Sequence, residues 1–314
     1  MERTASHVER SIVIDAPPVV TFTVLNGFRQ FGKWSPWADI DPDAVTTLDG
    51  PATGVGARMS WSGNAEVGSG GQEILESTSP SLIRLRLTFG DFPGEFQASY
   101  ALAAEGAGTR VTWSFDADYG SSIMGRYFGL IADSMLGPDY EKGLGRLKAF
   151  VESLPKADFS GLQFESVVSA GAPVVLLSTR TAADANAIGV ALGVAYGKLS
   201  GYIAANGLKQ AGPPLATYAG ESDGMLSIDA AIPVDELRGT PAAPIQAGRS
   251  FEGLAVKAAY HGDYSGLPAA REQLRAYLAA AGLSQGGPMW EQYASDPGST
   301  PAAELVTNIF VPIK

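Results

Sequence analysis

Residues 207–213 read Gly-Leu-Lys-Gln-Ala-Gly-Pro, and residues 282–288 read Gly-Leu-Ser-Gln-Gly-Gly-Pro. The two stretches lie 75 residues apart and mark an internal repeat in the second half of the chain. Each copy is predicted to form a strand, a helix and two further strands. The copies cover about residues 162–235 and 249–314. Together they predict a pseudo-twofold domain in which the groove between the copies is a natural ligand site.

The first half of the chain shows a different pattern, in which apolar and polar residues alternate along short segments. Residues 83–89, 96–102 and 111–117 follow it most clearly, as expected for an antiparallel sheet with one covered face. Residues 123–154 then carry apolar side chains at steps of three and four, which predicts a long amphipathic helix with a bend at Gly137-Pro138. The sequence therefore predicts the α+β class, with a curved antiparallel sheet around a long closing helix.

A short segment separates the two patterns. Residues 155–161 follow the end of the predicted helix and precede the repeat, and we place a linker at residues 156–161. The predicted domains are a ligand-binding domain of residues 1–155 and a second domain of residues 162–314.

The composition excludes several classes of function. The chain has 314 residues, a formal net charge of −11, no cysteine and two histidines. Disulfides, thiolate catalysis and cysteine-ligated metals are therefore excluded, and we predict no metal and no cofactor. The acidic balance argues against direct nucleic-acid binding.

The sequence also predicts a cytoplasmic protein. The start of the chain lacks the pattern of a signal peptide. The most apolar stretch, residues 173–177, is far shorter than the about 20 residues that span a bilayer, so no membrane span is expected. The oligomeric state is left open.

Aromatic residues mark a candidate cavity in the first half. Two tryptophans lie on the apolar phase of predicted strands, and two lie in the loop of residues 33–37. Core packing is the alternative reading, but loop aromatics at a cavity mouth often contact ligand. The predicted cavity residues are Trp34, Trp37, Trp61, Phe89, Trp113 and Tyr127.

Polar residues on predicted strands mark a candidate groove in the second half. In residues 226–232 and 304–311, alternation places Asp229 and Asn308 on the face opposite the apolar one. They hold equivalent positions in the two copies, because a four-residue insertion widens the offset to 79 residues in this part of the repeat. In one interpretation, both side chains are polar groups that contact and orient a ligand in an apolar groove. In the other, both face solvent on an uncovered sheet. The predicted groove residues are Tyr218, Asp229, Tyr264, Trp290, Tyr293 and Asn308.

No complete catalytic constellation is present in the sequence. With only two histidines in the chain, a Ser-His-Asp triad is not expected. The sequence also has no phosphate-binding loop that ends in Gly-Lys-Ser/Thr. His261 remains as a lone acid or base, or as a surface loop residue. In an enzyme, Tyr218, Tyr264 and Tyr293 would donate protons, with Glu304 or Asp229 as the base.

Residues 8–154 resemble the SRPBCC superfamily (START-like, polyketide cyclase/dehydrase type). The matching stretches are residues 10–18, 34–37, 54–57 and 108–113. The resemblance implies a helix-grip fold with a deep apolar cavity between sheet and helix. It implies no single reaction, since such folds carry lipids, hormones and polyketides as well as catalysing cyclisations.

Residues 162–314 resemble the GyrI-like effector-binding domain. The matching stretches are residues 261–264, 287–293 and 304–313. The family pattern ends in Thr-Glu-Ile, and its buried Glu attracts cationic drugs or serves catalysis. This sequence has Asn308 there, and an amide carries no charge and is no general base. Our hypothesis is that Asp229 supplies the missing charge.

These observations predict a protein that binds small, largely apolar molecules in two separate cavities, for sensing, sequestration or detoxification. The expected partner is a small apolar or lipophilic-cation ligand. One alternative is a hydrolase or cyclase-type enzyme acting in one cavity. The other is a regulatory protein-interaction module.

Overall fold

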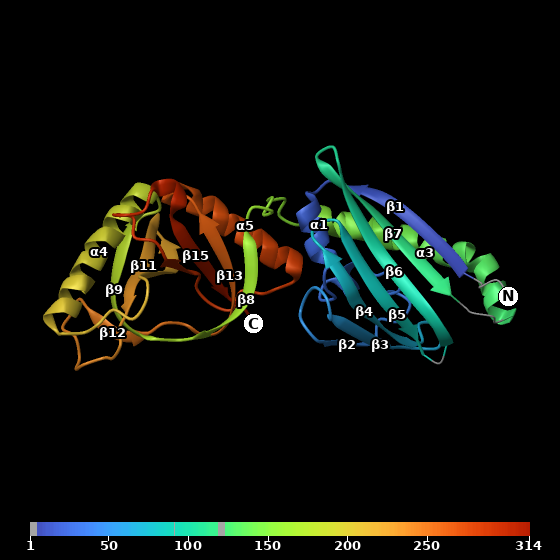
Figure 1. The fold of residues 1–314 in the computed structure, drawn as a ribbon, viewed down its shortest axis with the longest axis horizontal. Coiled ribbons are helices and arrows are strands. Elements are labelled where there is room, and N and C mark those ends of the chain that lie inside the picture. The colour runs from blue at the N-terminus through green and yellow to red at the C-terminus, as the bar shows by residue number, and fades with distance from the viewer. Residues whose placement is uncertain (1–4, 91, 119–122) are drawn as a thin grey trace. The chain divides into compact units, whose positions relative to one another are not determined.

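The chain folds into two compact units, which are described separately. The computed structural model describes residues 5–90, 92–118 and 123–314 (Figure 1). The main division between the units falls between Phe159 and Ser160. Both units combine a sheet with helices, so the predicted α+β class is confirmed.

The first unit is a seven-stranded antiparallel sheet with one long helix and two short ones. The sheet order is β1-β7-β6-β5-β4-β3-β2. Its elements are β1 (Ala5–Ile14), α1 (Pro18–Leu25), α2 (Phe31–Trp34), β2 (Val45–Asp49), β3 (Arg58–Ser62), β4 (Ser69–Thr78), β5 (Leu82–Phe89), β6 (Phe92–Glu105), β7 (Gly108–Asp118) and α3 (Ile123–Glu152). This is the predicted curved sheet with its closing helix.

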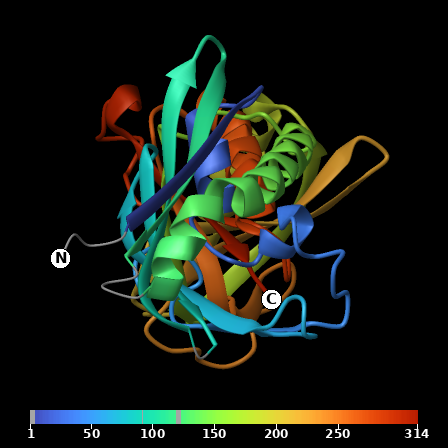
Figure 2. The same cartoon turned by 90° about the vertical axis from the view of Figure 1, so that its right-hand side faces the viewer.

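The helix α3 lies along β1 on one face of this sheet (Figures 1 and 2). Arg10 of β1 joins the two elements, because its guanidinium contacts Asp133 at 2.8 Å and Glu141 at 2.9 Å. Gly137 makes room for it, since a Cβ there would lie 2.2 Å from the guanidinium. Pro138 follows inside α3, where it cannot donate the usual helix hydrogen bond.

The second unit is an eight-stranded sheet with two main helices. Its elements are β8 (Gln163–Ala170), β9 (Pro173–Ala182), α4 (Ala185–Ala205), β10 (Leu215–Ser222), β11 (Met225–Pro233), β12 (Gln246–Arg249), β13 (Glu252–His261), η1 (Tyr264–Gly266), α5 (Leu267–Ala281), β14 (Trp290–Tyr293), η2 (Ala302–Glu304) and β15 (Val306–Pro312).

The order of this sheet shows the predicted repeat. The strands follow each other as β12-β9-β11-β10-β14-β15-β13-β8. The first copy, β9-α4-β10-β11, and the second, β13-α5-β14-β15, therefore meet at the pair β10 and β14. Two strands were not expected from the repeat, β8 and β12, and each pairs with the first strand of the other copy.

The repeated sequence motif ends each helix and turns the chain into the next strand. Gly207 and Gly282 have φ values of +63° and +68°, a conformation that glycine adopts at little cost. Three residues later, the side chains of Gln210 and Gln285 donate to backbone carbonyls two residues ahead, at 2.8 and 2.7 Å. The repeated motif therefore forms the same turn in both copies.

The helix α4 covers one face of the sheet. Asp184 caps its N-terminus by accepting a hydrogen bond from the backbone of Ala187 at 2.9 Å. Leu192, Ala195, Leu199 and Ile203 are its buried side chains, and they belong to one core cluster with residues of β9, β10 and β11.

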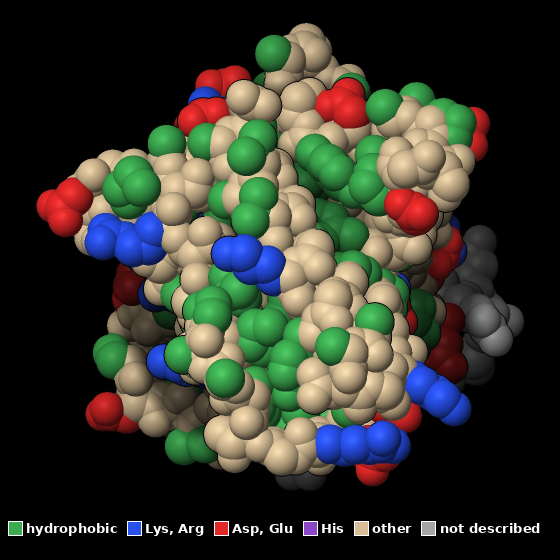
Figure 3. Space-filling model, turned by 90° about the vertical axis from the view of Figure 1, so that its left-hand side faces the viewer, with side chains coloured by type: hydrophobic (Ala, Val, Ile, Leu, Met, Phe, Trp, Pro, Cys, Tyr) green, Lys and Arg blue, Asp and Glu red, His purple; other side chains and the backbone are tan. Residues whose placement is uncertain are grey.

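The opposite side of α4 is apolar as well. Val190 and Val194 are 62% and 56% exposed. Figure 3 shows the side of the second unit that carries α4, and hydrophobic side chains run through the middle of this face. Among the described residues, α4 is the one helix whose length and composition would suit a membrane span, with a mean hydropathy of 1.3. Because its inner side packs on the sheet, we interpret α4 as a core helix of the unit.

Candidate functional sites

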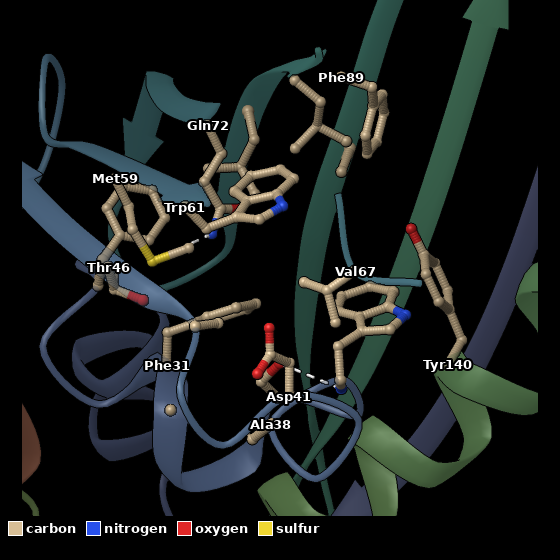
Figure 4. Close-up of a pocket in the computed structure, with 18 of the residues that line it drawn as sticks. Phe31, Ala38, Asp41, Thr46, Met59, Trp61, Val67, Gln72, Phe89 and Tyr140 are labelled. Carbon is tan, nitrogen blue, oxygen red and sulfur yellow. Dashed lines mark hydrogen bonds between the residues drawn. The ribbon is translucent and has the colours of Figure 1, made fainter. Parts of the chain in front are cut away.

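A pocket of about 610 Å³ lies in the first unit, between the sheet and the helices α2 and α3 (Figure 4). Its wall is contributed by side chains of α2, α3, strands β2 to β7 and the loops after α1, α2 and β3. Most of them are apolar or aromatic, among them Phe31, Met59, Leu85, Leu87, Phe115 and Leu136. A volume of this size falls within the about 300–1,000 Å³ of typical small-molecule sites.

Four of the six cavity residues predicted from the sequence line this pocket: Trp37, Trp61, Phe89 and Trp113. Trp34 does not line it; this side chain is 2% exposed and packs edge-on against Trp113, with ring centroids 5.5 Å apart. The side chain of Tyr127 lies outside the described residues.

Two glycines lie directly beside tryptophan rings of the pocket wall. The Trp113 ring stacks on Tyr140 of α3 at 3.9 Å, and a Cβ on Gly143 would lie 2.8 Å from the indole. A Cβ on Gly70 would likewise lie 2.4 Å from the Trp61 ring. Both glycines therefore leave the space that an indole ring occupies.

The polar part of the pocket wall includes Arg29, Asp41, Glu66 and Gln72, and two tyrosine hydroxyls. Tyr100 of β6 and Tyr140 of α3 are 3% and 2% exposed, and both line the pocket. Neither hydroxyl has a hydrogen-bond partner within the part of the chain that the structure describes. In Figure 4, Tyr140 extends from α3 with its hydroxyl at the end farthest from the helix.

Burial keeps these hydroxyls protonated. It raises the pKa of Tyr100 well above the usual value of a phenol, and the pKa of Tyr140 is raised for the same reason, with a smaller contribution from Asp116. Both groups are therefore hydrogen-bond donors at any ordinary pH. The sequence patterns contained both residues, on the apolar phase of a strand and of the long helix, but gave no sign that they face a cavity.

In the second unit, the sheet divides the predicted groove residues into two sets. Asp229, Trp290 and Asn308 lie on the face away from the helices. Trp290 stacks on Phe310 with ring centroids 4.8 Å apart, and Asn308 Nδ2 donates to Gln292 Oε1 at 3.1 Å. Asp229 accepts a hydrogen bond from Ser178 at 2.6 Å.

The other set, Tyr218, Tyr264 and Tyr293, lies on the helix side around a carboxylate that the sequence reasoning did not select. Glu291 of β14 is 0% exposed. Its Oε2 accepts hydrogen bonds from Tyr218 at 2.9 Å and from Tyr293 at 2.8 Å. Its Oε1 contacts Arg271 of α5, which donates from Nε at 2.7 Å. We call Tyr218, Arg271, Glu291 and Tyr293 the glutamate cluster.

The buried charge of the second unit is therefore in the glutamate cluster, on the opposite side of the sheet from Asp229 and Asn308. Two signals in the sequence point to Glu291: the 75-residue offset relates Tyr218 to Tyr293, and Glu291 shares the strand face of Tyr293. Glu304 and His261 are exposed side chains outside this cluster.

Electrostatics in the glutamate cluster keep its tyrosines neutral and its arginine charged. Burial raises the pKa of Tyr218 and of Tyr293, and the nearby carboxylate of Glu291 adds to both shifts. Burial is the largest influence on the pKa of Arg271 and lowers it, but the attraction and hydrogen bond to Glu291, together with the attraction to Tyr218 and Tyr293, outweigh it and the net shift is upward. Among the described residues, no group of three or more His, Asp and Glu side chains is placed to hold a metal ion.

Comparison with protein families agrees with both geometries. Residues 5–152 match the family described as "polyketide cyclase / dehydrase and lipid transport", and residues 165–314 match the "GyrI-like small molecule binding domain". The chain is a polyketide cyclase/dehydrase (SRPBCC) domain fused to a GyrI-like small-molecule binding domain. Both resemblances seen in the sequence are confirmed.

Solved structures resemble either half of the chain at low identity. Protein CV1439 from Chromobacterium violaceum is 20% identical over 47% of this chain and 97% of its own, with a TM-score of 0.37. The C-terminal domain of EcmrR is 17% identical over 49% of this chain and 98% of its own, with a TM-score of 0.41. No curated protein matches the sequence.

Proposed function

We propose that the polyketide cyclase-type domain binds an apolar small molecule that carries a hydrogen-bond acceptor. The observation that carries this proposal is the pocket of about 610 Å³, whose mostly apolar wall includes two tyrosine hydroxyls without partners among the described residues. An apolar ligand body fits the aromatic wall, and an acceptor such as a carbonyl fits the hydroxyls of Tyr100 and Tyr140.

The hydroxyls of Tyr100 and Tyr140 favour a ligand that has a hydrogen-bond acceptor. A ligand that fills the pocket removes water from them, and a buried donor left without a partner costs about 1–3 kcal/mol. A carbonyl oxygen that accepts from Tyr140 or Tyr100 avoids this cost. A carbonyl compound is therefore expected to bind more tightly than the same skeleton without the oxygen.

Apolar burial supplies most of the affinity. A ligand that buries about 300 Å² of apolar surface gains roughly 7 kcal/mol at about 25 cal/mol per Å². Micromolar binding corresponds to about 8 kcal/mol. The tyrosine hydrogen bonds are therefore needed to reach it, because ordering of ligand and side chains subtracts from the gross gain.

Isothermal titration of the full chain with flavanone and flavan tests this function, since the two differ in one carbonyl group. We expect flavanone to bind about tenfold more tightly than flavan, and Leu87→Trp, which fills the pocket, to abolish binding of both. Leu75→Trp is the matched control, because Leu75 is 44% exposed and does not line the pocket. Equal affinities in the wild type and Leu87→Trp would refute the proposal.

The same mixture separates binding from catalysis. A binding protein returns its ligand unchanged, whereas the enzyme alternative predicts a product by mass spectrometry after incubation. Reversible binding suits sensing, sequestration or detoxification of a small molecule. We also propose a cytoplasmic location, supported by the absence of cysteine and so of disulfides.

A further inference from the structure

In the glutamate cluster of the GyrI-like domain, a cation of the chain itself contacts the buried carboxylate. Arg271 Nη2 lies 2.6 Å from Glu291 Oε1, and Nε of the same guanidinium lies 2.7 Å from it. The guanidinium also lies over the ring of Tyr218, with its carbon 4.2 Å from the ring centroid. A carboxylate together with aromatic faces is an arrangement that binds organic cations.

Further aromatic rings surround this ion pair. Tyr264 packs edge-on against Tyr293 with ring centroids 5.6 Å apart, and Tyr196 of α4 does so at 6.2 Å. The hydroxyl of Tyr196 donates to the backbone carbonyl of Leu215 at 2.7 Å. The ring is thereby held beside the cluster.

The repeat shows that arginine is not required by the fold at this place. The 75-residue offset relates Arg271 of α5 to Tyr196 of α4, and both side chains reach the cluster from their helices. One copy thus places an aromatic ring where the other places a cation. The same offset relates Glu291 to Ala216, so the arginine and its carboxylate occur together in the second copy only.

We propose that Arg271 is the resident cation of this anionic aromatic site, and that it makes the GyrI-like domain select uncharged ligands over lipophilic cations. With Arg271 in place, the carboxylate of Glu291 is neutralised and all its hydrogen bonds are supplied by the chain. An external cation then has to displace the guanidinium. The inference rests on the small-molecule binding role of this domain and is independent of the ligand proposed for the other domain.

Tetraphenylphosphonium and triphenylphosphine oxide are suitable probes, because they have similar bulk and differ in charge. We would titrate both into the full chain carrying Leu87→Trp, so that the pocket of the first domain is blocked. Arg271→Met is expected to tighten binding of tetraphenylphosphonium at least tenfold relative to the oxide. Adding Glu291→Gln to Arg271→Met should abolish that gain.

Two results would overturn the proposal. One is an Arg271→Met protein whose affinity for tetraphenylphosphonium does not rise. The other is a rise that persists in the double variant, because the gain would then not depend on the carboxylate.

A second experiment covers the case in which Arg271→Met folds poorly. Arg271→Ala removes the guanidinium, and millimolar ethylguanidinium is then expected to restore several degrees of the lost melting temperature. The wild type and the Arg271→Ala/Glu291→Gln double variant should show no such shift. Absence of rescue in Arg271→Ala, or equal rescue in the double variant, would contradict a resident-cation role.

Discussion

The buried ion pair of the glutamate cluster makes a strong prediction about stability. Glu291 is 0% exposed and Arg271 15% exposed, so removing either partner leaves the other charge desolvated without its counter-ion. Breaking such a pair costs about 3–5 kcal/mol. We expect about 3 kcal/mol for Arg271→Met and a similar loss for Glu291→Gln, which corresponds to a fall in melting temperature of roughly 6–12 °C for a domain of this size.

The double variant distinguishes this mechanism from a general loss of packing. Replacing both charges by neutral groups of similar shape removes the desolvation cost as well as the attraction. Tyr218 and Tyr293 can still donate to the amide oxygen of Gln at position 291. We therefore expect the double variant to lose only about 1 kcal/mol, much less than the two single losses together.

Urea unfolding of the full chain, followed by circular dichroism, measures these values as changes in the transition of the GyrI-like domain. Glu304→Gln is the matched control, since this carboxylate is exposed and its loss should change stability by less than about 0.5 kcal/mol. The reasoning is refuted if each single variant loses under about 1 kcal/mol, or if the double variant loses the sum of both.

Three further outcomes follow from local geometry. Gly143→Val should lower stability by about 1–3 kcal/mol in thermal unfolding, because its Cβ would lie 2.8 Å from Trp113. The hydrogen bond to Asp116 raises the pKa of His7 above 6.5, so its contribution to stability is present below pH 6.5 and lost as pH rises through the folded value. NMR titration should show a lower pKa for His7 in Asp116→Asn than in the wild type. Asp184→Ala should lower the free energy of unfolding by about 1 kcal/mol in urea, and no change would contradict its capping role.

Much of the first domain could be predicted from its sequence. Alternation in residues 83–89 and 111–117 marks strands with one buried face, and that face carries Ile83, Leu85 and Trp113 in the structure. Local periodicity is enough here because the sheet is antiparallel and one of its faces packs against the helices. The predicted cavity residues were selected by residue type alone, and Trp34 shows the weakness of that criterion. It is a core residue one layer behind the pocket wall.

In the second domain, the sequence predicted the architecture but not the buried carboxylate. The repeat predicted its symmetric architecture, and strand parity separated Asp229 from the apolar face of β11 that packs on α4. A charged residue is normally expected on an exposed face, so its residue type argued against burial of Glu291, and only the strand face that it shares with Tyr293 pointed to it. Its burial is possible because Arg271, 20 residues earlier on a helix, reaches it across the core.

The order of residues alone determined the two-domain α+β plan, the strand faces, the long helix and the glycines that end α4 and α5. These depend on periodicity and on backbone conformation, which act over a few neighbouring residues. Only the tertiary structure decided which aromatic rings border a hollow and which pack behind them. It also decided which carboxylate is buried with an arginine, because both outcomes depend on distances between residues far apart in the chain.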